Sequence, residues 1–330
     1  MPKLPRVAVI IPAYNEENVI GNCIESLLRQ TYENFCAHII DDQSTDTTQQ
    51  IIRRYAEAYP NKIKLQFFGK LGPGKARNRV ATEVAADIYA FTDADCEVTP
   101  RWLEELIRGI DFEGVVSCGG PQLAHPTSTD FQQKLERFFS LTSPLIDFYQ
   151  NKTDISETRH NPLCNVAYRS EVFRSLKGFR EDLFPGEDVE IDLRIKQRGH
   201  RIHYNPRAIV FHHRPESIAQ FKKVMRAYGR AQGKLFRESG PRRTIQYIGI
   251  IASLFTFGII IASLLLQNLG LLVAALLIVA GFYFIRPNSE SLLSILLNSL
   301  EWFNGFLIGL FTNKSPPPGM NIGTKHDVKT

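Results

Sequence analysis

Apolar segments that end in polar residues, two of them just before a helical pattern, recur through the N-terminal third of this 330-residue chain. Helical spacing over residues 19–28 and 47–58 follows the first two segments. Ligands of open α/β sheets bind where the strands end, so the three segments are predicted to face one site. The segments and the polar residues that follow them are Val7 to Ile11 before Pro12, Ala13, Tyr14, Asn15 and Glu16; His38 to Ile40 before Asp41 and Asp42; and Ile88 to Thr92 before Asp93 and Asp95.

Two acidic pairs stand out within this α/β pattern. Asp93 and Asp95 are one residue apart, so an extended chain points both carboxylates to the same side. Paired carboxylates of this kind hold a hard divalent cation between themselves and a phosphate, which predicts Mg²⁺ or Mn²⁺ as a cofactor. Asp188 follows Asp95 by 93 positions, next to Glu187 and at the start of a helical pattern over 189–197.

The motifs taken together resemble the family 2 glycosyltransferases with the GT-A fold, over roughly residues 5 to 215. The resemblance implies transfer of a sugar from a nucleotide-diphosphate sugar, preferably a uridine nucleotide, with inversion at the anomeric carbon. It also implies that Asp93 holds ribose and metal, that Asp95 holds metal, and that the other donor contacts lie in the segments listed here: Pro12, Ala13, Tyr14, Glu16, Asp41, Asp42, Lys75, Arg77, Asn78.

The chemistry of an inverting transfer predicts roles for particular residues. Asp188 is the candidate general base, because a carboxylate must take the proton of the attacking hydroxyl. Arg77 and Lys75 lie in a glycine-rich basic loop, where a guanidinium fork and a point charge could hold the diphosphate. A divalent metal would act as a Lewis acid on the departing nucleoside diphosphate.

Further candidates lie on the acceptor side of the motif set. Asn165 belongs to a segment that resembles the acceptor region of the family, and Glu187 is expected to orient the acceptor or a neighbouring arginine. His212 and His213 follow an apolar segment at the position where many relatives supply a third metal ligand. We favour His212, and His213 stays open.

The C-terminal third predicts membrane attachment. The 42 residues between Arg243 and Arg286 carry no charge and would extend about 63 Å as a helix, roughly two bilayer cores. They are interpreted as spans at about 245–266 and 269–285. A third apolar segment, 291–311, carries a polar stripe and is expected either to lie in the interface or to cross. The tail 313–330 is expected to be disordered and cytoplasmic.

Charge is concentrated just before these segments. Residues 194–243 contain 14 Lys and Arg against 2 acids, whereas the whole chain has a net charge of +5. Within this block, 217–237 is predicted to form a basic amphipathic helix on an anionic surface, which makes membrane lipid a likelier partner than nucleic acid. The catalytic domain is therefore expected to span 1–240 and the membrane region 241–312.

No signal peptide is expected before the first strand, and the five cysteines have no zinc-binding spacing. Both observations favour a cytoplasmic catalytic domain at the cell membrane. The overall pattern is similar to enzymes that extend lipid-linked saccharides in exopolysaccharide assembly of the succinoglycan type. A processive polysaccharide synthase is the alternative, although the Gln-x-x-Arg-Trp signature of that class is missing. A polyprenyl-phosphate acceptor is a second alternative, and a transfer to it would need no general base.

Overall fold

The computed structural model describes residues 4–146, 152–240 and 292–312, together with positions 247, 251, 258, 261, 262 and 270. Contacts divide these residues into two compact units. The sheet unit contains the described residues up to 128 and those from 152 to 214. The helical unit contains residues 129–146 and the described residues from 215 onward.

The sheet unit contains every strand among the described residues. In chain order its elements are β1 (Val7–Ala13), α1 (Ile20–Leu28), β2 (Phe35–Asp41), α2 (Thr48–Ala58), β3 (Ile63–Gln66), α3 (Pro73–Glu83), β4 (Ile88–Phe91), β5 (Cys96–Val98), α4 (Trp102–Ile110), β6 (Val115–Gly119), β7 (Gln122–Ala124), β8 (Ser156–Glu157), the 3₁₀ turn η1 (Leu163–Asn165), β9 (Val166–Arg169), α6 (Ser170–Ser175), α7 (Glu187–Gln197), β10 (Arg201–Tyr204) and β11 (Val210–His212).

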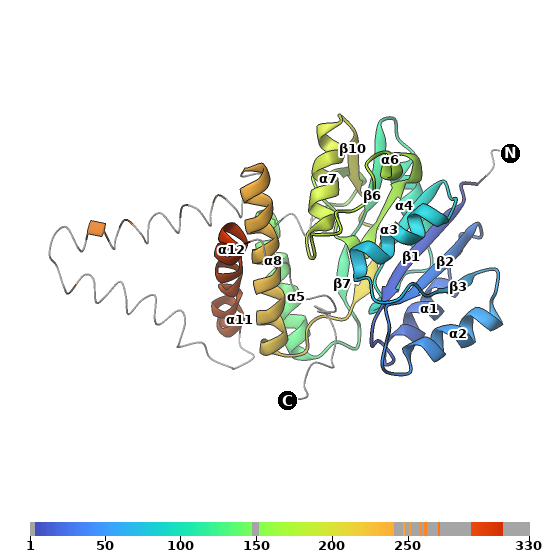
Figure 1. Ribbon diagram of the computed structural model, residues 1–330, viewed down its shortest axis with the longest axis horizontal. Coiled ribbons are helices and arrows are strands. Elements are labelled where there is room, and N and C mark those ends of the chain that lie inside the picture. The colour runs from blue at the N-terminus through green and yellow to red at the C-terminus, as the bar shows by residue number, and fades with distance from the viewer. Residues whose placement is uncertain are drawn as a thin grey trace. The chain divides into compact units, whose positions relative to one another are not determined.

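A mixed eight-stranded sheet forms the centre of this unit, in the order β3-β2-β1-β4-β9-β6-β10-β8. The strands β3, β2, β1 and β4 are parallel, while β9 runs antiparallel to both of its neighbours. The chain moves outward from β1 through β2 to β3, which Figure 1 labels side by side. It then returns to the other side of β1 as β4. Such a reversal of strand order opens a crevice at the carboxyl ends of the strands, where ligands bind.

The sequence alternation of β1 explains why helices cover both faces of the sheet. Val7, Val9 and Ile11 are buried with the apolar sides of α1, α2 and α4. Ala8 and Ile10 point the other way and are buried with α3, α6 and α7. Period-two alternation with apolar residues on both faces is the pattern of a strand covered by helices on each side. The predicted α/β fold is therefore confirmed as a three-layer arrangement with a mixed sheet.

A second, three-stranded sheet has the order β5-β11-β7. The strand β11 pairs antiparallel with β5, so that His212 lies opposite Cys96. It pairs in parallel with β7, so that His212 also lies beside Ala124. This small sheet brings the residues after Asp93 next to a segment more than 110 positions away in the chain.

The helical unit consists of α5 (Asp130–Ile146), α8 (Ile218–Ser239), α11 (Leu292–Ser299) and α12 (Glu301–Phe311). None of the helices that the structure describes combines the length and the apolar content needed to cross a bilayer. The predicted spans at 245–266 and 269–285 lie almost entirely outside the described residues, as does the tail from 313. The third apolar segment forms α11 and α12, which differs from the single helix that we expected.

The predicted basic helix is α8, which starts one residue after its N-cap Ser217. Its apolar residues, including Ile218, Phe221 and Leu235, are buried inside the helical unit. The polar stripe of the third apolar segment is also buried, at Ser294, Asn298 and Glu301. Glu301 binds the Arg226 guanidinium through one oxygen, at 2.7 and 2.8 Å. The apolar face of α8, which we had expected to meet lipid, is therefore covered by protein. The boundary between the two compact units falls after residue 214, whereas we had expected the catalytic domain to end at 240.

Four glycines allow α8 and α12 to pack with their backbones in contact. Gly229 and Gly233 on α8 face the carbonyl oxygens of Trp302 and Phe306. Gly305 and Gly309 on α12 face the carbonyl oxygens of Arg226 and Arg230. A Cβ atom at any of the four positions would overlap the facing backbone. Each helix thus carries a Gly-x-x-x-Gly pair, the spacing that brings helices closest together.

We expect Gly305→Ala to destabilise the helical unit by about 1–3 kcal/mol, the usual cost of forcing extra atoms into a packed contact. Thermal unfolding of the purified full chain measures the effect. Gly21→Ala in α1 is the matched control, because its added Cβ would meet only the Tyr55 hydroxyl at 4.0 Å. An unchanged midpoint for Gly305→Ala would show that the two helices are not in close contact.

Candidate functional site

The loops that follow β1 and β2 are tied together by side chains. Asn15 adopts a left-handed backbone with φ of 56°, and its Oδ1 accepts hydrogen bonds from the Thr45 backbone N–H and hydroxyl at 2.8 and 3.3 Å. The Ser44 hydroxyl accepts a hydrogen bond from the Asn15 N–H at 3.0 Å. One carboxylate oxygen of Glu17 accepts hydrogen bonds from the Thr47 N–H and hydroxyl at 3.0 and 2.7 Å. The two loops therefore form one wall at the carboxyl ends of the parallel strands, where Pro12, Ala13 and Tyr14 were predicted to act.

Asp41 and Asp42 lie at the end of β2, and both are buried. Asp42 accepts hydrogen bonds from the backbone N–H groups of Leu71 and Gly72 at 2.6 and 3.0 Å. It therefore holds the loop that leads into α3, and Gly72 in this loop has a φ of 80° that favours glycine. Asp41 accepts from the Ser44 N–H and the Gln49 amide.

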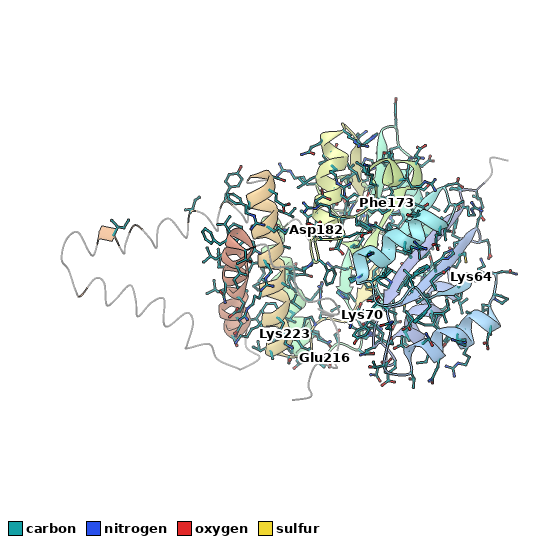
Figure 2. The ribbon with its side chains drawn as sticks, viewed as in Figure 1. Lys64, Lys70, Phe173, Asp182, Glu216 and Lys223 are labelled. Carbon is teal, nitrogen blue, oxygen red and sulfur yellow. The ribbon has the colours of Figure 1, made fainter. Side chains whose placement is uncertain are left out.

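The start of α3 and the loop before it supply positive charge near these acids. The Lys70 ammonium lies 5.1 Å from the centre of the Tyr14 ring, and Figure 2 labels this lysine. Lys75 is exposed at the start of α3. Asn78, predicted to contact the donor, instead exchanges hydrogen bonds with the backbone of Phe179, each 2.8 Å long. Its amide fixes that loop beside the aromatic cluster around Phe173, so we no longer assign it to the nucleotide sugar.

Arg77 connects the two acidic motifs. Its guanidinium is buried and pairs with Asp93 at 2.5 Å and with Glu187 at 3.4 Å. This ion-pair bridge confirms that the motifs, 93 positions apart, meet in one place. It also corrects the prediction for Arg77, because a guanidinium held between two carboxylates does not present an open fork to a phosphate. Of the two roles expected for Glu187, this contact favours orienting a neighbouring arginine.

Glu187 and Asp188 are adjacent but differ in exposure. Gly186, with a φ of 110°, makes the turn that places both residues in the first turn of α7. The Glu187 side chain is 3 % exposed, whereas that of Asp188 is 19 % exposed. Asp188 is therefore the carboxylate of this pair that a substrate can reach, as a general base requires.

Hydrogen bonds hold the Asp188 carboxylate in place. Its Oδ1 accepts from the Val189 N–H at 2.7 Å and its Oδ2 from the Leu163 N–H at 3.2 Å. Nε2 of His160 lies 3.8 Å from the same Oδ2, and Nδ1 of His160 lies 2.9 Å from Asp192. Sequence reasoning missed His160 and Asp192. The four-residue spacing of Asp188 and Asp192 on one helix face was a usable signal for Asp192, but no local pattern marked His160.

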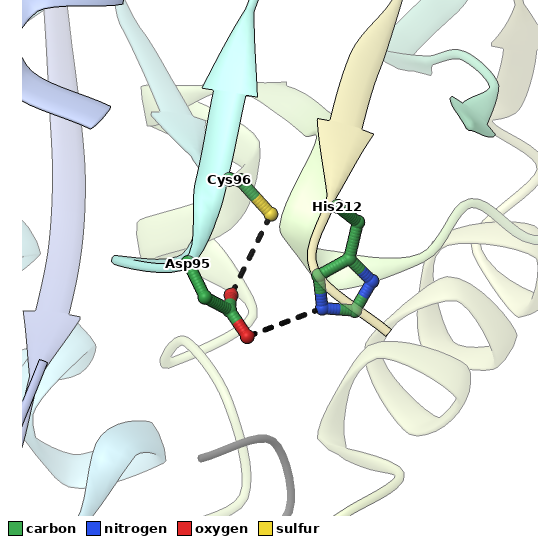
Figure 3. A group of neighbouring side chains, drawn as sticks. All are labelled: Asp95, Cys96 and His212. Carbon is green, nitrogen blue, oxygen red and sulfur yellow. Dashed lines mark hydrogen bonds and ion pairs between the residues drawn. The ribbon is translucent and has the colours of Figure 1, made fainter. Parts of the chain in front are cut away.

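Asp95, Cys96 and His212 form a compact group of possible metal ligands (Figure 3). The Asp95 Oδ2 lies 3.4 Å from Nε2 of His212, and the Asp95 Oδ1 lies 3.7 Å from the Cys96 sulfur. Nδ1 of His212 lies 3.1 Å from the Gln122 side-chain oxygen, which can orient the ring as a second partner. A carboxylate, an imidazole and a buried thiol whose ligand atoms converge fit a divalent cation.

The electrostatics of this group bring opposite charges together. Burial is the largest effect on Asp95 and acts to raise its pKa, but His212, His213 and a backbone hydrogen bond together lower it, so the net pKa lies below the usual range. Burial acts to lower the pKa of His212, but Asp95 raises it to about 9. The pKa of Asp93 is raised, mainly by its burial and against the effect of Arg77. Asp93, predicted as a further metal ligand, is outside the converging group, and one of its oxygens binds Arg77.

Asn165 lies too deep to contact an acceptor. It is fully buried, and its Oδ1 accepts a hydrogen bond from the Trp102 indole at 2.8 Å. Its amide donates to the carbonyl oxygens of Pro121 and Ala208 at 2.8 and 2.7 Å. These bonds use both of its donors on the protein itself. The prediction that Asn165 binds the acceptor is therefore corrected, and its role is to join α4 to the segments around β7 and β11.

Glu187→Gln should change how stability depends on pH. Burial raises the pKa of Glu187 from 4.5 to about 8, against the opposing effect of Arg77. A carboxyl whose pKa rises on folding contributes its full stability below pH 4.5, and this contribution is lost as pH rises through 8. The melting temperature of wild type should therefore fall further than that of Glu187→Gln between about pH 5 and about pH 9. Parallel melting curves for the two proteins would contradict this assignment.

A mixed α/β sheet with acidic residues gathered at the carboxyl ends of its strands defines the GT-A class of glycosyltransferases. Residues 8–177 match glycosyl transferase family 2, and this match covers just over half of the chain. The chain belongs to this glycosyltransferase family. The predicted family and the α/β GT-A fold are thereby confirmed, and the predicted enzyme type agrees with the family. The C-terminal membrane helices that were part of the predicted fold lie almost entirely outside the described residues.

Individual relatives agree with the family assignment. The chain is 29% identical over 202 residues to glycosyltransferase AglE of Haloferax volcanii, covering 60% of this chain and 64% of AglE. It therefore spans less than two thirds of that relative's length. It is 28% identical over 255 residues to the O-antigen chain rhamnosyltransferase WbaN of Salmonella anatum, covering 71% of this chain and 79% of WbaN.

Among solved structures, the fold resembles the mannosyltransferase PcManGT from Pyrobaculum calidifontis, solved in complex with GDP-Man and Mn²⁺. The TM-score is 0.66 at 18% sequence identity, and the match covers 94% of this chain and 88% of that one. At this identity the likeness establishes the shared fold.

Proposed function

We propose that this glycosyltransferase moves a sugar from a nucleotide-diphosphate sugar to a hydroxyl of a lipid-linked saccharide, with inversion at the anomeric carbon. The observation that carries the proposal is the meeting of the two acidic motifs through Arg77 at the carboxyl ends of the strands. This meeting brings a candidate metal pair, Asp95 and His212, and a partly exposed base, Asp188, into the same unit.

The donor end is formed by the loops after β1, β2 and β4. The wall made by Asn15 and Thr45, together with Tyr14 and Lys70, supports binding of a base and ribose, because a flat ring and hydrogen-bonding groups lie together there. Lys75 is exposed and could pair with phosphate as a point charge. The solved relative carries GDP-Man, which supports a nucleotide-diphosphate sugar as the donor. The family resemblance favours uridine, so a UDP-sugar is the first donor to test.

Asp95 and His212 would hold a divalent metal, and Mn²⁺ accompanies the nucleotide sugar in the solved relative. A bound ion would supply Lewis-acid stabilisation of the diphosphate as it leaves. The residues of this chain perform the other tasks. Arg77 holds Asp93 and Glu187 in position, and Asp188 takes the proton from the acceptor hydroxyl while its backbone hydrogen bonds keep the carboxylate oriented.

Several features support an acceptor at a membrane. Apolar side chains on α12, Leu307 and Phe311, are exposed, while the polar residues of the same segment are buried. Polar residues that face the interior and apolar residues that face outward are typical of helices next to lipid. The basic residue Lys223 on α8 is exposed and suited to anionic headgroups, and Figure 2 labels it. These features support a membrane location, and we propose the cytoplasmic face of the cell membrane, as expected from the sequence.

The base distinguishes the acceptor classes. A polyprenyl monophosphate is already ionised and would need no proton acceptor, whereas a saccharide hydroxyl does. The hydrogen-bonded and accessible Asp188 therefore favours a hydroxyl. One relative, WbaN, is named an O-antigen chain rhamnosyltransferase, which supports a saccharide acceptor during polysaccharide assembly.

Transfer of labelled sugar tests the proposal. Membranes that contain the full chain are given a panel of labelled nucleotide sugars, with and without chelator, and the label in extracted lipid is measured. We expect label in a lipid-linked saccharide that depends on divalent metal. Label in a polyprenyl phosphate with one sugar would reject the hydroxyl acceptor, and long insoluble polymer would indicate a processive synthase instead.

A further inference from the structure

Two adjacent histidines of the small sheet point to opposite faces. Phe211 pairs with Glu97 on β5 and with Leu123 on β7, so these three side chains share one face. Two residues further along, His213 and His125 return to that face, because side chains alternate with a period of two. His212 points to the other face with Cys96, its direct partner. Each face of this small sheet therefore carries its own group of metal-ligand side chains.

The second group consists of Glu97, His125 and His213. Their ligand atoms all lie within 4.8 Å of one another. Nε2 of His125 is 3.1 Å from the Glu97 Oε1, and the two imidazole rings stack with centres 4.8 Å apart and an angle of 21°. Glu97 lies on β5, whereas His125 and His213 directly follow β7 and β11. The fold therefore brings together residues that are up to 116 positions apart in the sequence.

Two details indicate that this group is prepared for a ligand. Nε2 of His213 is buried and has no hydrogen-bond partner among the residues that the structure describes. A buried imidazole nitrogen without a partner is costly unless something else satisfies it. Nδ1 of His125 lies 2.7 Å from the Thr127 hydroxyl, which orients the ring from its far side. Metal-binding histidines commonly have such a second partner.

We propose that Glu97, His125 and His213 form a second cation site that binds Zn²⁺. Two imidazoles and one glutamate are a donor set that zinc accepts, with a further position for water. Imidazole favours late first-row cations over Mg²⁺, so this site differs in preference from a carboxylate-rich one. The site shares no ligand with the group of Asp95, Cys96 and His212, in which Cys96 and His212 point to the opposite face.

An ion at this place would cross-link β5, β7 and β11. The strand β5 directly follows Asp95, and β11 ends with His212. An ion that links these strands would therefore fix the spacing between Asp95 and His212. The His213 backbone N–H donates to the Asp95 carbonyl at 3.1 Å, which ties the two faces through one peptide bond. The structure thus assigns the second ion a positioning role for the Asp95 group.

Zinc binding by the full chain tests this site directly. After removal of metal with chelator, the detergent-purified protein is titrated with Zn²⁺ against a coloured competitor. We expect two bound equivalents in wild type and one in the double variant Glu97→Gln with His213→Ala, whose remaining site is the Asp95 group. His212→Ala should keep the second site, and His200→Ala is a matched control that should behave as wild type. Equal zinc binding by the double variant and wild type would overturn the proposal.

Cobalt spectra identify which ion is lost and do not depend on enzyme activity. Co²⁺ at the Asp95 group should show a thiolate charge-transfer band from Cys96, whereas Co²⁺ at the second group should show only weaker ligand-field bands. The double variant should keep the thiolate band and lose only the share of the ligand-field intensity that the second group contributes. Should His213→Ala fail to fold, the single variant Glu97→Gln provides the same comparison, with zinc affinity expected to fall by at least about tenfold. Unchanged ligand-field bands in a folded Glu97→Gln protein would reject the site.

Discussion

Asp188→Asn should reduce the rate of sugar transfer by about 10²–10⁴-fold, the usual contribution of a positioned general base. The asparagine side chain has nearly the same shape and can still accept a hydrogen bond from Val189 or Leu163, so the protein should fold normally. It cannot take a proton from the acceptor hydroxyl. Because the base acts on the acceptor, the loss should appear in kcat, while the KM for the nucleotide sugar stays close to that of wild type.

The control for this variant is Asp182→Asn. Asp182 is an exposed carboxylate in the same unit that pairs with Arg180 at 2.6 Å, so its change removes a charge without touching the proposed base. We expect wild-type rates from it. Transfer by Asp188→Asn at more than about a tenth of the wild-type rate would argue against the base and for an acceptor that is already ionised, such as a polyprenyl phosphate.

His212→Ala should raise the Mn²⁺ concentration needed for half-maximal transfer by at least about 10–100-fold. Loss of the partners around a metal ligand alone typically costs this much, and His212 is proposed to be a ligand itself. The variant leaves Asp95 without the imidazole that lies 3.4 Å away. At saturating Mn²⁺ part of the activity should return, because the weaker site can still be filled by mass action.

The matched control for this prediction is His200→Ala, which removes an imidazole from the same unit outside both ligand groups. Its metal dependence should equal that of wild type. A chelator-sensitive wild type together with an unchanged Mn²⁺ response in His212→Ala would remove His212 from the donor site. Comparison with His213→Ala then shows whether the other histidine, which the structure places on the opposite face, has that role.

The fold class followed from local patterns. Strand alternation at Val7 to Ile11, the apolar helical spacing of α1 and the acids after β4 are short-range features, and each was sufficient to place an element or a strand end. The carboxyl ends of parallel strands meet at one edge of a sheet, so the site could also be located from the sequence. Boundaries were less accurate, because β1 continues to Ala13 and α7 begins at Glu187.

Individual side-chain roles were less predictable than the location of the site. Arg77 was expected at a phosphate but lies between Asp93 and Glu187, and Asn165 was expected at the acceptor but binds Trp102. The partners in these contacts are between 16 and 110 positions apart in the chain. Nothing in the local sequence states which charged side chain will be enclosed by two others. That outcome depends on which helices pack on which face of the sheet.

The amino-acid sequence alone was sufficient for the family, the α/β class and the acids at the site, because these depend on periodicity and on motifs a few residues long. Only the tertiary structure decided which member of each pair of neighbouring residues faces the site. His212 lies with Asp95 while His213 lies with His125, and Asp188 is accessible while Glu187 is buried. The physical reason is that adjacent side chains differ only in direction, and direction is fixed by strand register and by burial against distant segments.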